Sequence, residues 1–185
     1  MTRSASLASA ASAASAGAGR AGSDAADGAL QAGSDAADGA LQAVLAAEEA
    51  ASYGYGVVGA HLTGSKRAAA VADWVAHQRA RDKLEAMLTA RRVTPQPAAV
   101  AYGLPIAVRT ESEAVSLAVI LEERITAAYL RLVVLGDTAL RELGAQRMQA
   151  SAVRAARWRG STVAFPGLPA SALAGPKRRR RAGRQ

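Results

Sequence analysis

The sequence predicts an all-α protein whose four helices form two antiparallel hairpins. Apolar residues recur with helical spacing in separate segments, and short turns alternate with one long proline-containing connection. Alanine makes up a large share of the hydrophobic residues, and alanine favours helix and close helix packing. The 185 residues suffice for one domain of about 100 to 150 residues with additional tails.

The first helix is expected from about Asp38 to Leu62. Its core-facing positions recur every seven residues, at Leu41, Glu48, Tyr55 and Leu62. Gly64 ends it, because glycine readily adopts the left-handed backbone that follows a last helical turn. Ser65 is then expected to be the N-cap of a second helix that runs to about Arg92.

A connection over residues 93–109 separates the two hairpins. It contains three prolines that no helix passes through, Pro95, Pro97 and Pro105. Thr110 and Glu113 form the pattern of a capping box, which predicts the start of the third helix. Gly136 is expected to end that helix.

The fourth helix is expected to start at an N-cap, Asp137 or Thr138, and to end near Gly160. The 17-residue connection reaches at most about 56 to 60 Å, whereas a helix of 26 residues is about 40 Å long. The connection can therefore run the full length of the bundle and make the second and third helices parallel. Two hairpins with one long central crossover form the ferritin-like four-helix bundle.

Three parts of the chain are distinguished by composition. Residues 1–33 are rich in alanine, serine and glycine and are expected to be disordered or loosely helical, with disorder also expected at the C-terminus. Residues 34–168 are expected to form the bundle, and residues 169–185 a linker and a basic tail. Residues 22–32 and 33–43 are identical, which indicates a recent duplication and not a solenoid.

Four ionisable side chains occupy positions where these helices should be apolar: Glu48, His77, Arg81 and Glu122. The stripe of the second helix is assigned to Ala70, Trp74, His77, Arg81, Leu84 and Leu88. The stripe of the third is assigned to Val115, Val119, Glu122, Ile125, Tyr129 and Leu132. Buried charges must be paired or must bind metal, so these residues are the candidate site.

A metal centre at Glu48, His77 and Glu122 is one alternative. Di-metal carboxylate bundles use single glutamates on two helices and a Glu-x-x-His pair on each of the other two. Trp74 stands where the glutamate paired with His77 is needed, and the fourth helix has no histidine. Arg81 would also oppose binding of a dication. A single metal ion or a degraded site therefore stays as an alternative, and no cofactor is predicted.

A structural ion network is the favoured alternative. Two carboxylates, one guanidinium and a histidine sum to a charge of zero or minus one, so they can neutralise one another. On this hypothesis Arg81→Ala costs roughly 3 to 5 kcal/mol. Glu49, Asp82 and Glu123 extend the network or form surface pairs. A small-molecule site built from the same groups is the third alternative.

Several segments together resemble a bacterial ferritin-like domain family of unknown function. They are Leu45-Ala-Ala-Glu48, Tyr53-Gly-Tyr55-Gly56, His77-Gln-Arg79-Ala-Arg81-Asp82, Tyr102-Gly-Leu-Pro105, Leu121-Glu122-Glu123-Arg124, Tyr129 and Trp158-Arg-Gly160. The resemblance covers about residues 40 to 168. It implies the ferritin-like fold and supplies no activity. Members of the family tend to carry Glu-His where this chain has Glu48-Glu49, which removes one candidate ligand.

The last nine residues carry most of the net charge of +8. Lys177, Arg178, Arg179, Arg180, Arg181 and Arg184 form a tail that attracts nucleic acid or another anionic surface, in a salt-dependent way. The alternative is a solvated run that aids solubility. The tail has no aromatic residue on which single-stranded bases could stack.

The chain has no cysteine, which excludes disulfides, thiolate-bound metals and cysteine nucleophiles. No apolar run reaches the length of a membrane span, and an integral membrane protein is not expected. The cytoplasm is the default location. Tyr53, Tyr55, Trp74, Tyr129 and Trp158 are expected to fill the core.

The sequence thus favours a non-enzymatic bundle that acts as a structural or interaction module with an unknown protein partner. The alternatives are a metal-binding or oxidoreductase protein of the same fold, and an adaptor that binds polyanions through its tail. Gly54, Gly56 and Gly59 interrupt the first helix, which is expected where another helix approaches closely. A second subunit could be that helix, so a homodimer is also considered.

Overall fold

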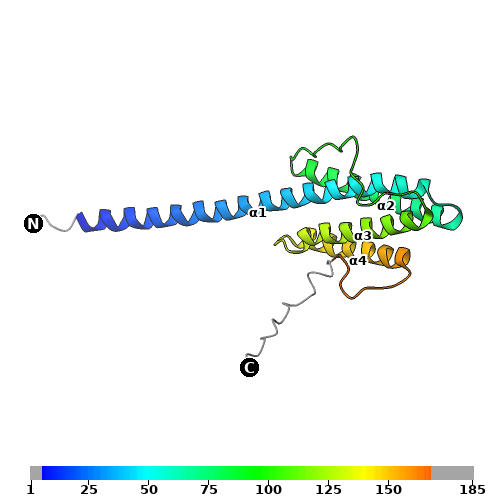
Figure 1. Ribbon diagram of the computed structural model, residues 1–185. Helices are drawn as coiled ribbons and strands as arrows, with labels where there is room; N and C mark the ends of the chain where they lie inside the picture. The colour runs from blue at the N-terminus through cyan, green and yellow to red at the C-terminus, as the bar shows by residue number, and fades with distance from the viewer. Residues whose placement is uncertain (1–5, 168–185) are drawn as a thin grey trace, which may run out of the picture.

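The protein is all-α over the residues that the structure describes. The computed structural model describes residues 6–167, with side chains from residue 26 onward, and this part forms four helices and no strand. The helices are α1 (Ser6–Ala60), α2 (Gly64–Ala90), α3 (Glu111–Val133) and α4 (Thr138–Arg159) (Figure 1). Within these bounds no helix combines the length and apolar character that crossing a membrane requires.

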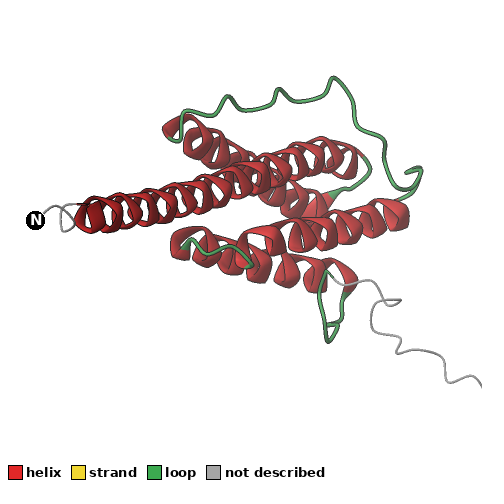
Figure 2. Cartoon of the chain, turned by 90° about the vertical axis from the view of Figure 1, so that its left-hand side faces the viewer, coloured by secondary structure: helices red, strands yellow, loops and turns green. Residues whose placement is uncertain are grey.

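The helices form two antiparallel pairs. The second helix runs back along α1, and α4 runs back along α3 (Figure 1). Residues 91–110 connect the pairs and run the length of the bundle on its outside (Figure 2), which leaves α2 and α3 parallel. The most extensive packing is between α3 and α4, followed by α1 against α2 and α1 against α3.

The predicted start of the first helix, at about Asp38, is wrong. Helix α1 begins at Ser6 and passes through the segment that we expected to be disordered or loosely helical. Alanine has the highest helix propensity, and no proline interrupts residues 6–37. Packing, in contrast, begins near the predicted position: Ala26 to Gly33 are exposed, and Ala37 is the first buried residue. Residues 6–33 therefore project beyond the bundle (Figure 1).

Most helix ends lie where the capping signals predict them. Thr110 and Glu113 form both hydrogen bonds of the capping box at the start of α3. The Asp137 carboxylate accepts two backbone N–H bonds at the start of α4, and Gly160 ends α4 in the left-handed conformation. One cap was misassigned: Thr63 is the N-cap of α2, and Ser65 lies inside that helix.

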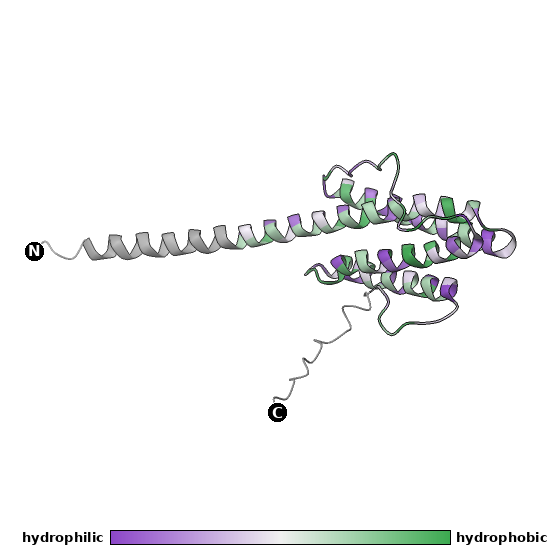
Figure 3. Ribbon diagram, in the orientation of Figure 1, coloured by the Kyte–Doolittle hydropathy of each residue, from purple (hydrophilic) through white to green (hydrophobic). Residues whose placement is uncertain are grey.

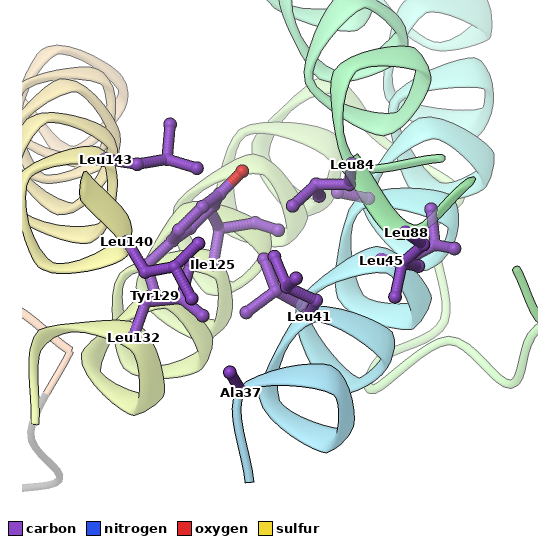
Figure 4. Close-up of a cluster of buried hydrophobic side chains, with 12 residues drawn as sticks. Ala37, Leu41, Leu45, Leu84, Leu88, Ile125, Tyr129, Leu132, Leu140 and Leu143 are labelled. Atoms are coloured by element: carbon purple, nitrogen blue, oxygen red, sulfur yellow. The ribbon is translucent and has the colours of Figure 1, made fainter. Parts of the chain in front are cut away.

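Two apolar clusters make up the core. All four helices contribute to the cluster drawn in Figure 4, which includes Leu41, Leu88, Tyr129 and Leu140. The second cluster lies nearer the α1–α2 turn and includes Tyr55 and Leu117. Hydrophilic residues interrupt the apolar colour on every bundle helix (Figure 3). Some of these are exposed, and others form a buried polar layer between the clusters.

Close helix contacts account for two of the glycines. A Cβ atom on Gly54 would lie 2.7 Å from the Leu121 side chain of α3, so the approaching helix belongs to the same chain. A Cβ atom on Gly56 or Gly59 would meet nothing within 4 Å, so packing among the described residues of this chain does not explain these two glycines. On α4, a Cβ atom at Gly144 would lie 3.0 Å from the Tyr129 carbonyl oxygen.

Gly144→Ala and Gly56→Ala are expected to change stability in opposite directions. The first introduces a methyl group against backbone that cannot move freely, and we expect a net loss of about 1 kcal/mol. The second places alanine in an open helical position and should stabilise by about 0.5 to 1 kcal/mol. Urea denaturation measures both, and equal stabilisation by the two variants would contradict the close α3–α4 contact.

Candidate functional site

The polar layer is centred on His77 of α2. Its Nδ1 lies 2.6 Å from Glu48 Oε2 on α1, and its Nε2 lies 3.0 Å from Glu122 Oε1 on α3. The exposed fractions of all three residues are at or below 1%. Three of the four predicted site residues are therefore brought together, in the place that the helix periodicity predicts.

The two buried carboxylates accept further hydrogen bonds. Glu48 Oε1 accepts a bond of 2.7 Å from the Tyr129 hydroxyl. Glu122 Oε1 accepts a hydrogen bond of 2.7 Å from the Tyr55 hydroxyl and one of 2.8 Å from Arg154 Nε on α4. Each of the four helices thus supplies at least one member of a single connected network.

The geometry requires the imidazolium form of His77. Carboxylate oxygens only accept, so both ring nitrogens must carry protons to donate to Glu48 and Glu122. Burial lowers the pKa of His77, but the hydrogen bonds and negative charges of Glu122 and Glu48 outweigh burial and raise the pKa to about 9. The histidine is therefore a cation at neutral pH.

The pKa values of the groups around His77 are shifted in directions that keep Glu122 ionised and the two tyrosines neutral. Burial raises the pKa of Glu122, but the hydrogen bond and charge of His77, together with Arg154, bring it below its usual value. Burial, with the charges of Glu122 and Asp73, raises the pKa of Tyr55 far above its usual value. Burial and Glu48 do the same for the pKa of Tyr129. Both tyrosines are therefore neutral donors.

The charges of the network cancel. Two carboxylates, Glu48 and Glu122, face two cations, His77 and Arg154. Asp73 of α2 extends the layer: its buried carboxylate is held by the Arg157 guanidinium at 2.6 and 2.7 Å and by the Trp158 indole N–H at 2.8 Å. That pair is also neutral, so the buried layer needs no external counter-ion.

Arg81 does not belong to this network, which corrects our prediction. Its side chain is 34% exposed and pairs with the adjacent Asp82 and with Glu85. The α2 stripe passes through Asp73 and Ala80, whereas the periodicity had been assigned to Trp74 and Arg81. The other four assigned residues of this stripe are buried, so only Trp74 and Arg81 were wrong, and each lies about 100° around the helix from its buried neighbour. Trp74 is 37% exposed, and Tyr53 of α1 is 40% exposed, so neither lies in the core as expected.

Sequence reasoning also missed Arg154, which takes the role assigned to Arg81. Arg154 and Ser151 lie on the buried side of α4, and the Arg154 guanidinium donates to Ser151 Oγ at 3.0 Å. The buried side of α4 carries only Leu140, Leu143, Gly144, Ser151 and Ala155, so no clear apolar stripe in the sequence marks the position of Arg154.

The residues considered as extensions make contacts elsewhere. Glu49 accepts a hydrogen bond of 2.9 Å from Tyr102 in the crossover, Asp82 pairs with exposed Arg81, and Glu123 pairs with Arg159. None of these bonds joins the central network. The predicted polyanion contacts, Lys177 and Arg178 to Arg181, lie outside the described residues.

The arrangement of donors does not suit a metal ion. Glu48, His77 and Glu122 are adjacent, but each ring nitrogen of His77 faces a carboxylate and carries a proton, so it has no free lone pair. Arg154 adds a permanent cation at Glu122. In the part of the chain from residue 26 to 167, no group of three or more His, Asp or Glu residues could hold a metal.

Two buried polar atoms have no partner among the described residues: Glu122 Oε2 and Ser52 Oγ. All three bonds to Glu122 converge on its other oxygen, Oε1. The free oxygen is the one acceptor of this carboxylate that the network does not use.

Arg154→Ala is expected to lower the free energy of unfolding by about 3 kcal/mol, because it leaves buried Glu122 without one of its two cations. The matched control is Arg81→Ala, which removes a surface guanidinium and should cost no more than about 0.5 kcal/mol. Chemical denaturation of both variants provides the comparison. A similar loss of unfolding free energy in the two variants would contradict the assignment of Arg154, and not Arg81, to the network.

Stability should fall as the pH rises from about 6.5 to about 9. The folded protein holds the His77 proton up to a pKa of about 9, whereas an unfolded histidine releases it near 6.5. The bound proton therefore stabilises the fold fully below about pH 6.5, and this stabilisation is lost through the folded pKa. Thermal melting between pH 6 and 10 measures the slope. His77→Gln should flatten it, and an unchanged slope in that variant would exclude His77 as its source.

Comparisons with known proteins give a family but no activity. The model of a domain of unknown function (DUF4439) matches residues 40–170. Among solved structures, the chain is similar to a conserved hypothetical protein, rv2844, from Mycobacterium tuberculosis, with 33% sequence identity and a TM-score of 0.66. That similarity covers 68% of this chain and 96% of the other. No curated protein matches the chain. The protein therefore belongs to the family defined by the domain of unknown function DUF4439.

Proposed function

We propose that this protein is a non-catalytic ferritin-like bundle in which a neutral ion network occupies the place of a di-metal site. Its role on this proposal is that of a structural or interaction module. The observation that carries the proposal is the doubly bonded His77 between Glu48 and Glu122, with Arg154 completing the charge balance.

The connectivity supports the ferritin-like assignment. Two antiparallel pairs joined by one long crossover, with α2 and α3 parallel, are the arrangement of that class. The buried layer also lies at the level where bundle proteins of this class carry metal, between inward-facing side chains of all four helices. The proposed domain spans residues 34–168, which agrees with the onset of packing at Ala37 and with the family match over 40–170.

The network also lacks features that catalysis would need. Glu48, His77 and Glu122 are enclosed between two apolar clusters, so no substrate reaches them without opening of the bundle. Their charges already satisfy one another. Such a layer instead fixes the register of the helices, because a shift of any helix would leave a buried charge without its partner.

A metal-binding or oxidoreductase protein of the same fold is the second candidate. One observation favours it: Glu122 Oε2 is buried without a partner, next to a histidine and a second carboxylate. A metal there would have to displace the protons of His77 and would add its charge beside Arg154.

Elemental analysis and thermal melting distinguish the two candidates. We expect the purified full chain to contain much less than one metal ion per molecule, and to melt at the same temperature with and without chelator. A ligand that binds the folded state raises the melting temperature. Because we expect no metal to bind, added Fe²⁺, Mn²⁺ or Zn²⁺ should leave the melting temperature unchanged. Stoichiometric metal, or a chelator-dependent loss of several degrees, would establish the second candidate.

A further inference from the structure

Exposed apolar side chains gather on one outer face of the bundle. Val153 of α4 is 62% exposed, and Val163 and Phe165, which follow α4, are 43% and 56% exposed. The loop that carries the last two lies outside α4, on the side away from α1 and α2 (Figure 1, Figure 2). Single exposed apolar residues are common on proteins, but a group of them marks a contact surface. We call Val153, Val163 and Phe165 the apolar face.

A small pocket opens on the apolar face. It has a volume of about 210 Å³, it is lined by Val153, Val163 and Pro166 among others, and the surface of its walls is almost entirely apolar. Two charged residues at its wall, Glu123 and Arg159, already pair with each other. The pocket therefore offers an apolar group a place out of water and offers a polar ligand few hydrogen bonds.

The loop that carries Val163 and Phe165 is attached to the bundle at both ends. It starts at Gly160, which ends α4 in the left-handed conformation. At its other end, a Cβ atom on Gly167 would lie 2.8 Å from the Thr126 side chain of α3, so the backbone of Gly167 packs directly against that helix. The two apolar side chains between these points are therefore held on the surface of the bundle.

The C-terminal quarter of the chain, residues 143–185, contains ten basic residues and no aspartate or glutamate. Three of its arginines pair with carboxylates on other helices: Arg154, Arg157 and Arg159. Six more basic residues lie in the tail, residues 177–185. Residues 34–176 carry 15 basic and 13 acidic groups, so the bundle has no excess of negative charge with which to neutralise the tail.

We propose that the apolar face and the tail together bind the surface of an anionic lipid membrane. Val153, Val163 and Phe165 enter the layer between headgroups and acyl chains, and the cations of the tail lie against the lipid phosphates. Ten residues lead from Gly167 to Lys177, and an extended chain of this length spans at most about 33 to 36 Å, so the tail can reach the plane that the apolar face contacts. Stable attachment to a membrane surface takes two such signals, because either one alone binds weakly and reversibly.

The apolar face favours a membrane over nucleic acid, although the tail alone would attract either. Binding to nucleic acid gains from cations at the phosphates and, for single strands, from aromatic residues that stack on bases. Residues 168–185 contain no aromatic residue, and the valines of the apolar face gain nothing from a phosphate backbone. At a membrane the same valines leave water, which is favourable.

Co-sedimentation of the full chain with lipid vesicles tests this proposal. Vesicles of phosphatidylcholine alone should bind little protein, whereas vesicles with about one third phosphatidylglycerol should bind it, and less so as the salt concentration rises. Replacement of four tail arginines by glutamine in one variant should weaken this binding by about a hundredfold; the four are Arg178, Arg179, Arg180 and Arg181. Phe165→Ser leaves the charge unchanged and should weaken binding by about tenfold, because it removes an apolar group from the lipid.

Val71→Ser is the matched control for Val163→Ser. Val71 of α2 is 49% exposed, close to the 43% of Val163, but it belongs to the other helix pair and lies outside the pocket. Val163→Ser should weaken vesicle binding, and Val71→Ser should leave it unchanged. Thermal melting of each variant checks that the fold is retained.

Equal vesicle binding by the wild type and Phe165→Ser would mean that charge alone attracts the protein, and it would overturn the proposal. Binding to duplex DNA without binding to anionic vesicles would overturn it too and would assign the tail to nucleic acid, and a failure to bind either would have the same consequence for the membrane. The inference names a partner for the interaction module proposed above. Because these variants leave the His77 network intact, the two proposals can fail separately.

Discussion

The imidazolium of His77 between two buried carboxylates is the interaction on which the rest of the structure depends. Glu48, His77 and Glu122 come from three different helices, and each is inaccessible to solvent. An isolated charge at this depth would be very costly, and removal of one member exposes the others to that cost. The network is tolerated because the cations and carboxylates are equal in number and because each carboxylate also accepts a hydrogen bond from a tyrosine hydroxyl.

The polar layer also determines how the helices are arranged. Apolar side chains pack in several registers at a modest cost, whereas a hydrogen-bonded ion pair tolerates only one. The layer lies between two apolar clusters, and it therefore fixes α1, α2 and α3 against one another. Arg154 and the Asp73–Arg157 pair add α4 to the same set of constraints. We propose that the clusters supply most of the stability and that the layer selects one register of the helices.

Local signals in the sequence predicted the helix ends and most of the buried centre. Thr110, Glu113 and Gly160 act on backbone groups within a few residues, so their roles can be inferred without the fold. Glu48 and Glu122 could also be found without the fold, because each interrupts a clear apolar stripe on its own helix. On α2, Trp74 was assigned to the buried stripe, but Asp73 is the buried residue. Asp73 is buried only because Arg157 and Trp158, more than eighty residues later, neutralise and bond it. The burial of Asp73 therefore depends on tertiary contacts, which the sequence of α2 alone does not reveal.

The protonation state of His77 tests this account most directly. Nitrogen-15 NMR of the imidazole ring at pH 7 distinguishes an imidazolium, in which both nitrogens carry protons, from a neutral tautomer, in which only one does. We predict that Nδ1 and Nε2 both have the shifts of protonated nitrogens and that their protons exchange slowly with solvent. One unprotonated ring nitrogen at pH 7 would contradict the doubly donating histidine, and with it the neutral network.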